Sequence, residues 1–301
     1  MKRILLAFII CGALLASCSK DDNIPSEEKV VVTFTLDASE VSTRAYGDGT
    51  TVNDLRYAIY SKGDYDNPLV WKTVNGAFAG DATSTTISEE LIRGNEYTAL
   101  FWADYDAAGD TYNNNAGARY TINWYTNTVT MNTDDLEAQD EKLDAFFAHK
   151  DFTATSRVEV EMKRPFAQLN ITANDYSYAT NNNIEVTKTA LSVEAYTQLN
   201  LLTGEVNGQA TINFSAADLP TAAAGAQGKH LSMNYILVGN SEYTAAPTLT
   251  VSYTKEGVAK SFSAIYNDVK LKRNRRTNIV GNIITSNLAG QNAGQNNTNN
   301  N

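Results

Sequence analysis

The fold is decided by the stretch Val30-Val31-Val32-Thr33-Phe34-Thr35-Leu36. Every second residue of it, Val30, Val32, Phe34 and Leu36, falls on one face of an extended chain, and a valine and two threonines fall on the other. Side chains alternate between the two faces of a β-strand, so this period of two predicts a strand that covers a hydrophobic core. We expect the strand to end at Asp37.

Short segments of similar character recur along the chain and predict an all-β protein. Tyrosine and phenylalanine are abundant, at 16 and 10 residues, and clusters of Asn, Asp and Gly separate the segments as turns. The expected strands are 55–61, 69–74, 97–103, 119–124, 129–131, 143–149, 158–162, 166–172, 185–195, 210–214, 233–238, 248–253, 259–266 and 277–284. Residues 134–142 are the one place where a helical turn or two is expected, because Asp134 and Asp135 suit a helix cap.

The spacing of these strands predicts two consecutive antiparallel β-sandwiches. We divide the chain into a lipoprotein signal peptide (1–17), a tether with the first strand and a candidate cleavage loop (18–45), an N-terminal sandwich (46–160), a C-terminal sandwich (161–286) and an Asn/Gln-rich tail (287–301). The tail has few apolar residues to bury, and we expect it to be disordered.

The N-terminus has the pattern of a bacterial lipoprotein signal. Lys2 and Arg3 precede a short apolar run, and Leu15-Ala16-Ser17-Cys18 closes it. The run is shorter than the ~20 residues of a membrane-spanning helix. We expect cleavage before Cys18 and lipidation of that residue; an ordinary secretory peptide is the alternative. The acidic stretch that follows, residues 19–23, resembles the surface-export signal of Bacteroidetes lipoproteins, which implies display on the outer face of the outer membrane.

Charge and cysteine content narrow the classes of function. Cleavage before Cys18 would leave 284 of the 301 residues, with 22 basic and 34 acidic side chains once Lys2 and Arg3 are removed. The resulting formal charge of -12 argues against nucleic acid as a partner. The remaining cysteine, Cys11, belongs to the signal, so we expect neither a disulfide nor thiol chemistry in the mature chain.

Several side chains raise the question of a binding site. Asp104, Asp106 and Asp110 suggest a calcium loop. However, the third ligand position is occupied by apolar Ala108, and Asn115 stands where a bidentate Glu is needed, so a turn is the better interpretation. The three tryptophans, Trp71, Trp102 and Trp124, suggest sugar stacking. We expect Trp102 to lie in the core and Trp124 to be the best surface candidate.

The remaining polar residues give little indication of an enzyme. His149 and His230 are the only histidines, and we interpret neither as a zinc ligand or catalytic base. No pair of carboxylates is distinguished as a glycosidase pair, and there is no phosphate-binding loop. The basic run Lys270, Lys272, Arg273, Arg275 and Arg276 suggests a polyanion site or a second proteolytic site, with a protective charged strand edge as the favoured interpretation.

Four segments carry a resemblance to a known family. They are Phe101-Trp102-Ala103-Asp104-Tyr105, Leu143-Asp144-Ala145-Phe146-Phe147, Lys163-Arg164-Pro165-Phe166-Ala167-Gln168-Leu169-Asn170-Ile171 and Leu271-Lys272-Arg273-Asn274. In this order and spacing they resemble the fimbrillin-like lipoproteins of Bacteroidales, the major and minor subunits of type V pili. The resemblance implies two Greek-key, transthyretin-like sandwiches and a structural or accessory pilus subunit that contributes to adhesion.

The resemblance also implies a mechanism of assembly by donor-strand exchange. A trypsin-like protease cuts after an arginine downstream of the first strand, here Arg44 before Ala45. The displaced strand would be 30–36, with Val30, Val32, Phe34 and Leu36 leaving the core. The implied partners are other fimbrial subunits or self, besides a host or bacterial surface ligand, and no cofactor or enzymatic activity is expected.

Burial energies constrain that mechanism. Four buried apolar side chains contribute about 6–12 kcal/mol as an upper estimate, which is comparable with the ~5–15 kcal/mol net stability of a domain. The groove therefore cannot stand empty: the strand stays or another replaces it. The donor strand and the place in a pilus, whether shaft, tip, cap or anchor, stay open. A glycan-binding surface lipoprotein is the alternative, and a secreted hydrolase has no support in the sequence.

Overall fold

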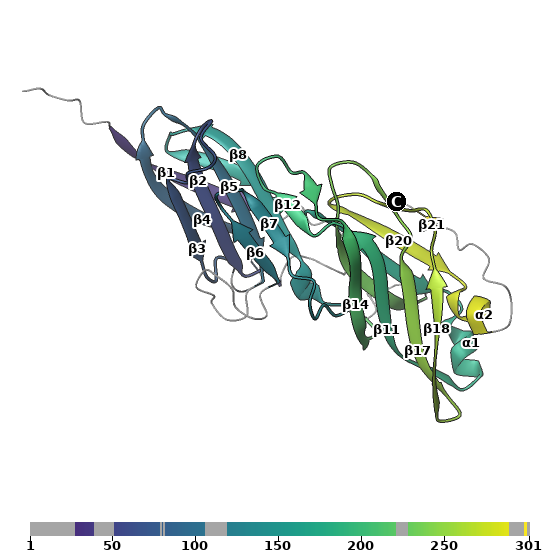
Figure 1. Ribbon diagram of the computed structural model, residues 1–301. Helices are drawn as coiled ribbons and strands as arrows, with labels where there is room; N and C mark the ends of the chain where they lie inside the picture. The colour runs from purple at the N-terminus through teal and green to yellow at the C-terminus, as the bar shows by residue number, and fades with distance from the viewer. Residues whose placement is uncertain are drawn as a thin grey trace, which may run out of the picture.

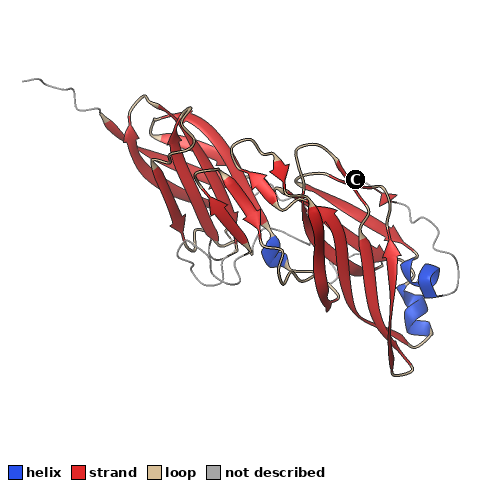
Figure 2. Ribbon diagram, viewed as in Figure 1, coloured by secondary structure: helices blue, strands red, loops and turns tan. Residues whose placement is uncertain are grey.

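The chain folds into two β-sandwiches that lie end to end along a common long axis (Figure 1). The computed structural model describes residues 28–38, 51–78, 80, 82–105, 119–220, 228–288 and 298–299. Within these residues nearly all regular structure is strand, and the helices are short (Figure 2). The predicted all-β fold class is confirmed.

The N-terminal sandwich consists of a three-stranded and a four-stranded sheet. The sheet orders are β4-β1-β9 and β3-β2-β5-β8. The strands are β1 (Lys29–Asp37), β2 (Asp54–Ser61), β3 (Val70–Val74), β4 (Ser84–Ile92), β5 (Glu96–Asp104), β8 (Ala145–Thr153) and β9 (Arg157–Glu161).

The C-terminal sandwich repeats the same strand order. Its sheets are β15-β10-β20, extended by β21, and β14-β11-β17-β18. The strands are β10 (Phe166–Ala173), β11 (Ile184–Ala195), β14 (Ala210–Asp218), β15 (Lys229–Leu237), β17 (Thr248–Lys255), β18 (Val258–Ile265), β20 (Arg275–Gly281) and β21 (Thr298–Asn299). The first strand of each sandwich is thus central in its sheet.

The sandwiches are not purely antiparallel. β1 pairs antiparallel with β4 but parallel with β9, and β10 pairs antiparallel with β15 but parallel with β20. In both cases the parallel partner is the last of the strands that build the sandwich. A parallel partner needs a long crossover connection, and here the intervening strands of the sandwich provide it.

A third sheet joins the two sandwiches, with the order β13-β12-β7-β6. Its strands are β6 (Tyr120–Asn123), β7 (Thr128–Met131), β12 (Gln198–Asn200) and β13 (Val206–Asn207), and a separate pair is formed by β16 (Tyr243–Ala245) and β19 (Val269–Leu271). β7 pairs with β12, so segments on either side of the predicted boundary share one sheet. The predicted domain bounds 46–160 and 161–286 stay predictions.

Two apolar clusters fill the molecule. One lies between the two sheets of the N-terminal sandwich and includes Phe34, Leu36 and Phe101. The other begins at Tyr60 and Trp102, on the opposite face of β2 and β5, and continues through the third sheet into the C-terminal sandwich. Burial on both faces explains why β5 is apolar along most of its length.

The structure departs from the sequence predictions at several places, among them the short strands β12, β13, β16 and β19, which were not predicted. β4 was not predicted, because the buried acid Glu89 interrupts its apolar alternation. The expected helical turns shrink to one 3-10 turn, Glu141–Leu143, which is capped by Asp140. The helix α1 (Tyr176–Asn181) was also missed. The predicted strand 277–284 ends at Gly281, and helix α2 (Ile283–Leu288) follows.

Asp175 explains the start of α2. Its carboxylate accepts hydrogen bonds from the backbone N–H groups of Ile284 and Thr285, at 3.1 and 2.6 Å, and so satisfies donors that the first turn leaves unpaired. α2 extends to Leu288, into the predicted disordered tail, and β21 pairs with β20 near the end of the chain. The prediction of disorder is therefore wrong for residues 287–288 and 298–299.

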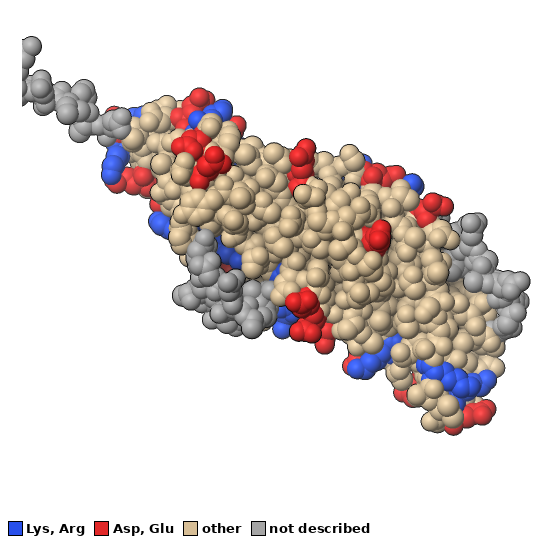
Figure 3. Space-filling model, in the orientation of Figure 1, with Lys and Arg blue, Asp and Glu red and all other residues tan. Residues whose placement is uncertain are grey.

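The outward face of the sheet β14-β11-β17-β18 has few charged side chains where it faces the viewer in Figure 3. Hydroxyl and amide side chains line it instead: Ser192 donates to Asn213 at 2.8 Å, and Thr250 and Ser263 lie 3.0 Å apart. No described helix is long and apolar enough to cross a membrane.

Candidate functional site: the first strand and the domain junction

Strand β1 is held by pairing along both edges. Its residues from Lys29 to Asp37 pair with β4 from Ile92 to Ser84, and its second half pairs with β9 from Arg157 to Glu161. Removal of β1 would therefore expose the edges of two neighbouring strands rather than one. Unpaired strand edges are templates for the addition of another strand.

The inner face of β1 provides much of the core of the N-terminal sandwich. Val30 is 9% exposed, and Val32, Phe34 and Leu36 are fully buried. The Phe34 ring packs edge-on against Phe101 and Phe152, with centroid distances of 5.7 and 5.1 Å. The predicted inward face is confirmed, whereas its role as a displaced strand stays a prediction. We call the space that β1 fills the β1 groove.

A buried carboxylate lies in the wall of the β1 groove. Glu89 on β4 stands opposite Val32 and is 8% exposed. Its carboxylate accepts a hydrogen bond from the Tyr57 hydroxyl. It also forms an ion pair with Lys72, with an N···O distance of 2.5 Å. Burial, and then Glu89, raise the pKa of Tyr57, so the hydroxyl stays a donor. A strand with an acid at the position of Val32 would be repelled here.

The described residues end at Ala38 before the predicted cleavage site and resume at Thr51 after it. Ala38, the residue after β1, is buried, and its backbone N–H donates to Thr83 at 2.8 Å. The predicted processing site Arg44–Ala45 and the predicted lipidation site Cys18 lie outside the described residues.

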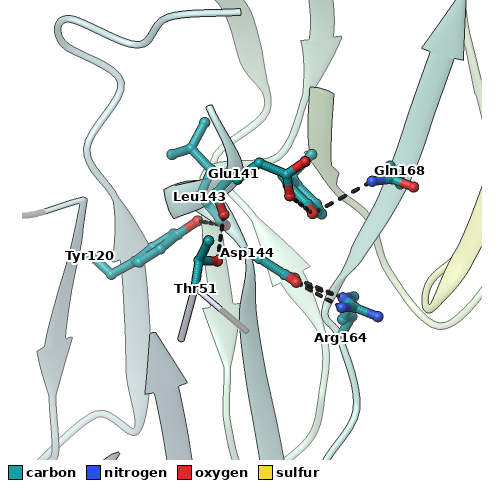
Figure 4. Close-up of polar contacts among 8 residues, drawn as sticks. Thr51, Tyr120, Glu141, Leu143, Asp144, Arg164 and Gln168 are labelled. Atoms are coloured by element: carbon teal, nitrogen blue, oxygen red, sulfur yellow. Dashed lines mark hydrogen bonds and ion pairs between the residues drawn. The ribbon is translucent and has the colours of Figure 1, made fainter. Parts of the chain in front are cut away.

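The junction between the sandwiches is built from the segments that carry the family resemblance. Asp144 and Arg164 form a buried ion pair in which Arg164 Nε and Nη2 donate to the carboxylate at 2.7 to 3.0 Å (Figure 4). The Arg164 guanidinium also lies 4.6 Å from the centre of the Phe146 ring. A planar fork that matches a carboxylate explains why arginine is needed here.

Further polar contacts surround this pair. The Tyr120 hydroxyl donates to the Leu143 carbonyl at 2.5 Å, and Thr51 donates to the carbonyl of Glu141 at 3.0 Å (Figure 4). Burial raises the pKa of Tyr120, and the nearby carboxylates of Asp104 and Asp144 raise it further. The predictions from sequence missed this network because its members are scattered over 114 positions of the chain, from Thr51 to Arg164.

Arg273 ties the closing segment to the junction. Its guanidinium donates to the carbonyls of Val238 and Gly204, both at 2.9 Å, and to the side chain of Asn240 at 2.6 Å. It also lies 5.2 Å from the centre of the Phe147 ring. Burial lowers the pKa of Arg273 to about 10, which leaves it charged at neutral pH. This arginine is therefore a structural element of the junction.

The predicted sugar-stacking surface is wrong for its best candidate. Trp124 is 2% exposed and belongs to the same apolar cluster as Trp102, because the β6–β7 hairpin packs against the sheet of the N-terminal sandwich. The neighbouring Tyr125 is exposed instead. Trp71, at 40% exposure, is the most accessible of the tryptophans, whereas Trp102 lies in the core as predicted.

The other candidate ligands are structural where they are described. Asp104 is buried against Arg56, and Asp106 and Asp110 lie outside the described residues. His149 lies on β8 beside Asp151, at 3.2 Å, and His230 lies on β15 beside Thr172, at 3.1 Å. Among the described residues, no group of three or more acids, histidines or cysteines is placed to hold a metal ion.

Comparison with known proteins places the sequence in a family. The model of the family of unknown function DUF6562 matches residues 22–298, which include both sandwiches and the junction. The chain belongs to the DUF6562 family. A search of curated proteins finds no match to this DUF6562 sequence.

Solved structures with a similar fold include proteins of Parabacteroides and Bacteroides species. A fimbrial assembly protein of Parabacteroides distasonis is 12% identical, with a TM-score of 0.43 and coverage of 84% of this DUF6562 chain and 90% of its own. A protein of Bacteroides eggerthii, provisionally described as a cell adhesion protein, is 13% identical, with a TM-score of 0.49 and 92% coverage of both chains. These likenesses are too distant to carry an argument about function.

Proposed function

We propose that this protein is a surface-exposed, lipid-anchored subunit of a pilus, structural or accessory, that is assembled by donor-strand exchange and contributes to adhesion. Its role is non-enzymatic, and its partners are related subunits or further copies of itself. Cys18 carries the lipid on the outer face of the outer membrane. The sequence segments that resemble fimbrillin-like lipoproteins are the starting point of this proposal.

The observation that carries the proposal is the position of β1. It is a central strand, it is paired on both edges, and it provides the inner face formed by Val30, Val32, Phe34 and Leu36. It is also the first described strand, and the candidate site Arg44 lies six residues beyond Ala38 in the sequence. A cut there would leave β1 bound only by non-covalent contacts.

Those contacts set the kinetics of exchange. The four inner side chains contribute at most about 6–12 kcal/mol, and each hydrogen bond of the two ladders adds about 0.5–1.5 kcal/mol. A nicked β1 would accordingly stay in place until another strand competes for the groove. This supports exchange rather than simple release.

An exchange experiment tests the proposal directly. A specific protease site replaces residues 42–47 of the full chain, and the cut protein is incubated with an excess of fluorescent peptide that has the sequence 28–38. We expect slow incorporation of the peptide and retention of the folded state. A matched peptide with Phe34→Asp should not enter. The proposal would be refuted if β1 dissociated after the cut and the melting temperature did not change. It would also be refuted if the labelled peptide never entered the β1 groove.

A second experiment addresses processing in the cell. Peptide mass spectrometry of the protein recovered from its native surface should find a mature N-terminus at Ala45, and Arg44→Ala should abolish it. A lipidated start at Cys18 in every molecule would exclude processing of this subunit at Arg44.

A further inference from the structure

A basic pocket lies at the junction of the two sandwiches. Four cationic side chains line it, Lys163, Lys272, Arg273 and Arg275, around a cavity of about 320 Å³. Its described lining includes no carboxylate. This local excess of positive charge occurs in a chain with 34 acidic and 24 basic residues, so the pocket differs in sign from the protein as a whole.

The cations of the pocket have different tasks. Arg273 uses its donors on Val238, Gly204 and Asn240, as described above, and thereby holds the wall in place. Lys163 lies 3.6 Å from the exposed carboxylate of Glu161. Lys272 and Arg275 are exposed, and their side chains make no hydrogen bond or ion pair with the described part of the chain.

A tight turn presents these two side chains together. The backbone N–H of Arg275 donates to the Lys272 carbonyl at 3.2 Å, and Asn274 within the turn has a φ of 55°. The Asn274 N–H donates to the Phe166 carbonyl at 2.8 Å, which fixes the turn to the first strand of the C-terminal sandwich. The first and last residues of such a turn lie close together, within ~7 Å between Cα atoms. Both residues therefore line the same pocket from the two ends of one turn.

The rest of the lining fits a sugar better than an acidic peptide. Phe147 contributes an apolar ring, and Asn240 and Asn274 contribute amide groups that suit hydroxyls. A cavity of this size is at the lower end of the ~300–1,000 Å³ typical of small-molecule sites. An extended acidic strand would need a longer row of cations or a free sheet edge along the pocket.

We propose that this pocket binds an acidic sugar, with Lys272 and Arg275 contacting its anionic group. Arginine and lysine form strong charge-assisted hydrogen bonds with carboxylates and with sulfate-like anions. The anion is the carboxylate of a uronic acid or a sulfate ester, both of which have the chemistry that this lining recognises. The site lies apart from the β1 groove and does not depend on strand exchange.

The site is tested by calorimetric titration of the chain that starts at Ser19, which keeps both sandwiches and leaves out the predicted signal and lipidation site. The probes are trigalacturonate, a sulfated chondroitin disaccharide, neutral galactotriose and hexaglutamate. We expect at least one acidic sugar to bind, more weakly as salt rises, and the neutral trisaccharide not to bind. Which acidic probe binds identifies the anion. The double variant Lys272→Gln/Arg275→Gln should reduce the affinity about tenfold or more, because each of the two substitutions removes a charge-assisted hydrogen bond to the anionic group of the sugar.

The matched control is Lys255→Gln/Lys260→Gln, which removes the same charge from the β17–β18 hairpin. It should leave the affinity unchanged, and the melting temperatures of both variants should match that of the parent. If both double variants lost the same affinity for the acidic sugar, the loss would be explained by the change in net charge alone, and the proposal would be overturned. Tight binding of hexaglutamate, or no binding of either acidic sugar, would also overturn it.

Discussion

The contribution of β1 to stability can be measured at a single residue, Phe34. The Phe34→Ala substitution removes a fully buried ring that packs edge-on against Phe101 and Phe152. Truncation of a buried phenylalanine to alanine costs about 3–5 kcal/mol, which is a large part of the ~5–15 kcal/mol that stabilises a domain. With a urea slope of about 1–3 kcal/mol per molar, the unfolding midpoint should fall by about 1 M or more.

Equilibrium urea unfolding, followed by far-ultraviolet circular dichroism, measures this loss. The control is Val31→Thr, on the same strand but 56% exposed and still β-branched, which should change stability by about 0.5 kcal/mol or less. Phe34→Leu should lie between the two. Equal midpoints for Phe34→Ala and Val31→Thr would refute the argument that the inner face of β1 is part of the core.

Three further predictions follow from the junction, the tryptophans and a histidine. Arg164→Ala should cost about 3–5 kcal/mol in chemical denaturation, since it leaves the Asp144 charge buried and unpaired, and the double variant Asp144→Leu/Arg164→Met should lose less. Acrylamide quenching of tryptophan fluorescence should fall sharply in Trp71→Phe, because the other two tryptophans are buried; strong residual quenching would contradict their burial. Burial, and then the charge of Lys229, lower the pKa of His230 below 6.5. The unfolded chain therefore binds more protons below that pH, and the melting temperature should fall as pH drops from 7.5 to 5. This decrease of the melting temperature should be smaller in His230→Gln, and an equal decrease in the variant and the parent would contradict the assignment to His230.

Local patterns predicted most strands, because alternation survives wherever one side of a strand faces a core. Alternation is not visible where a strand carries a buried polar group on its inner face, or where a strand is only two or three residues long, as are β12, β13, β16 and β19. β4 places Glu89 on its inner face, and the pairing of that acid with Tyr57 and Lys72 is visible only in three dimensions. Trp124 was misjudged for a related reason. Its surroundings in sequence are polar, but its hairpin packs on a sheet whose strands come from distant positions.

The candidate sites show the same division. The inward-facing residues of β1 were each predicted from the sequence, because a period of two assigns alternate side chains to one face of the strand. Its central position was not, because pairing with β4 and β9 joins residues about 50 to 125 positions away. The basic run after residue 269 was also visible, but not that Arg273 has a structural task while Lys272 and Arg275 stay accessible at one pocket.

The amino-acid sequence by itself determined the all-β class, most of the approximate strands and the inward face of β1. These depend on interactions between neighbours in the chain and on the partition of side chains between water and a core. Only the tertiary structure decided the parallel pairing of β1 with β9, the buried pair Asp144–Arg164 and the pocket between the sandwiches. Each of them requires groups that are distant in sequence to desolvate together, and no local pattern records that energy.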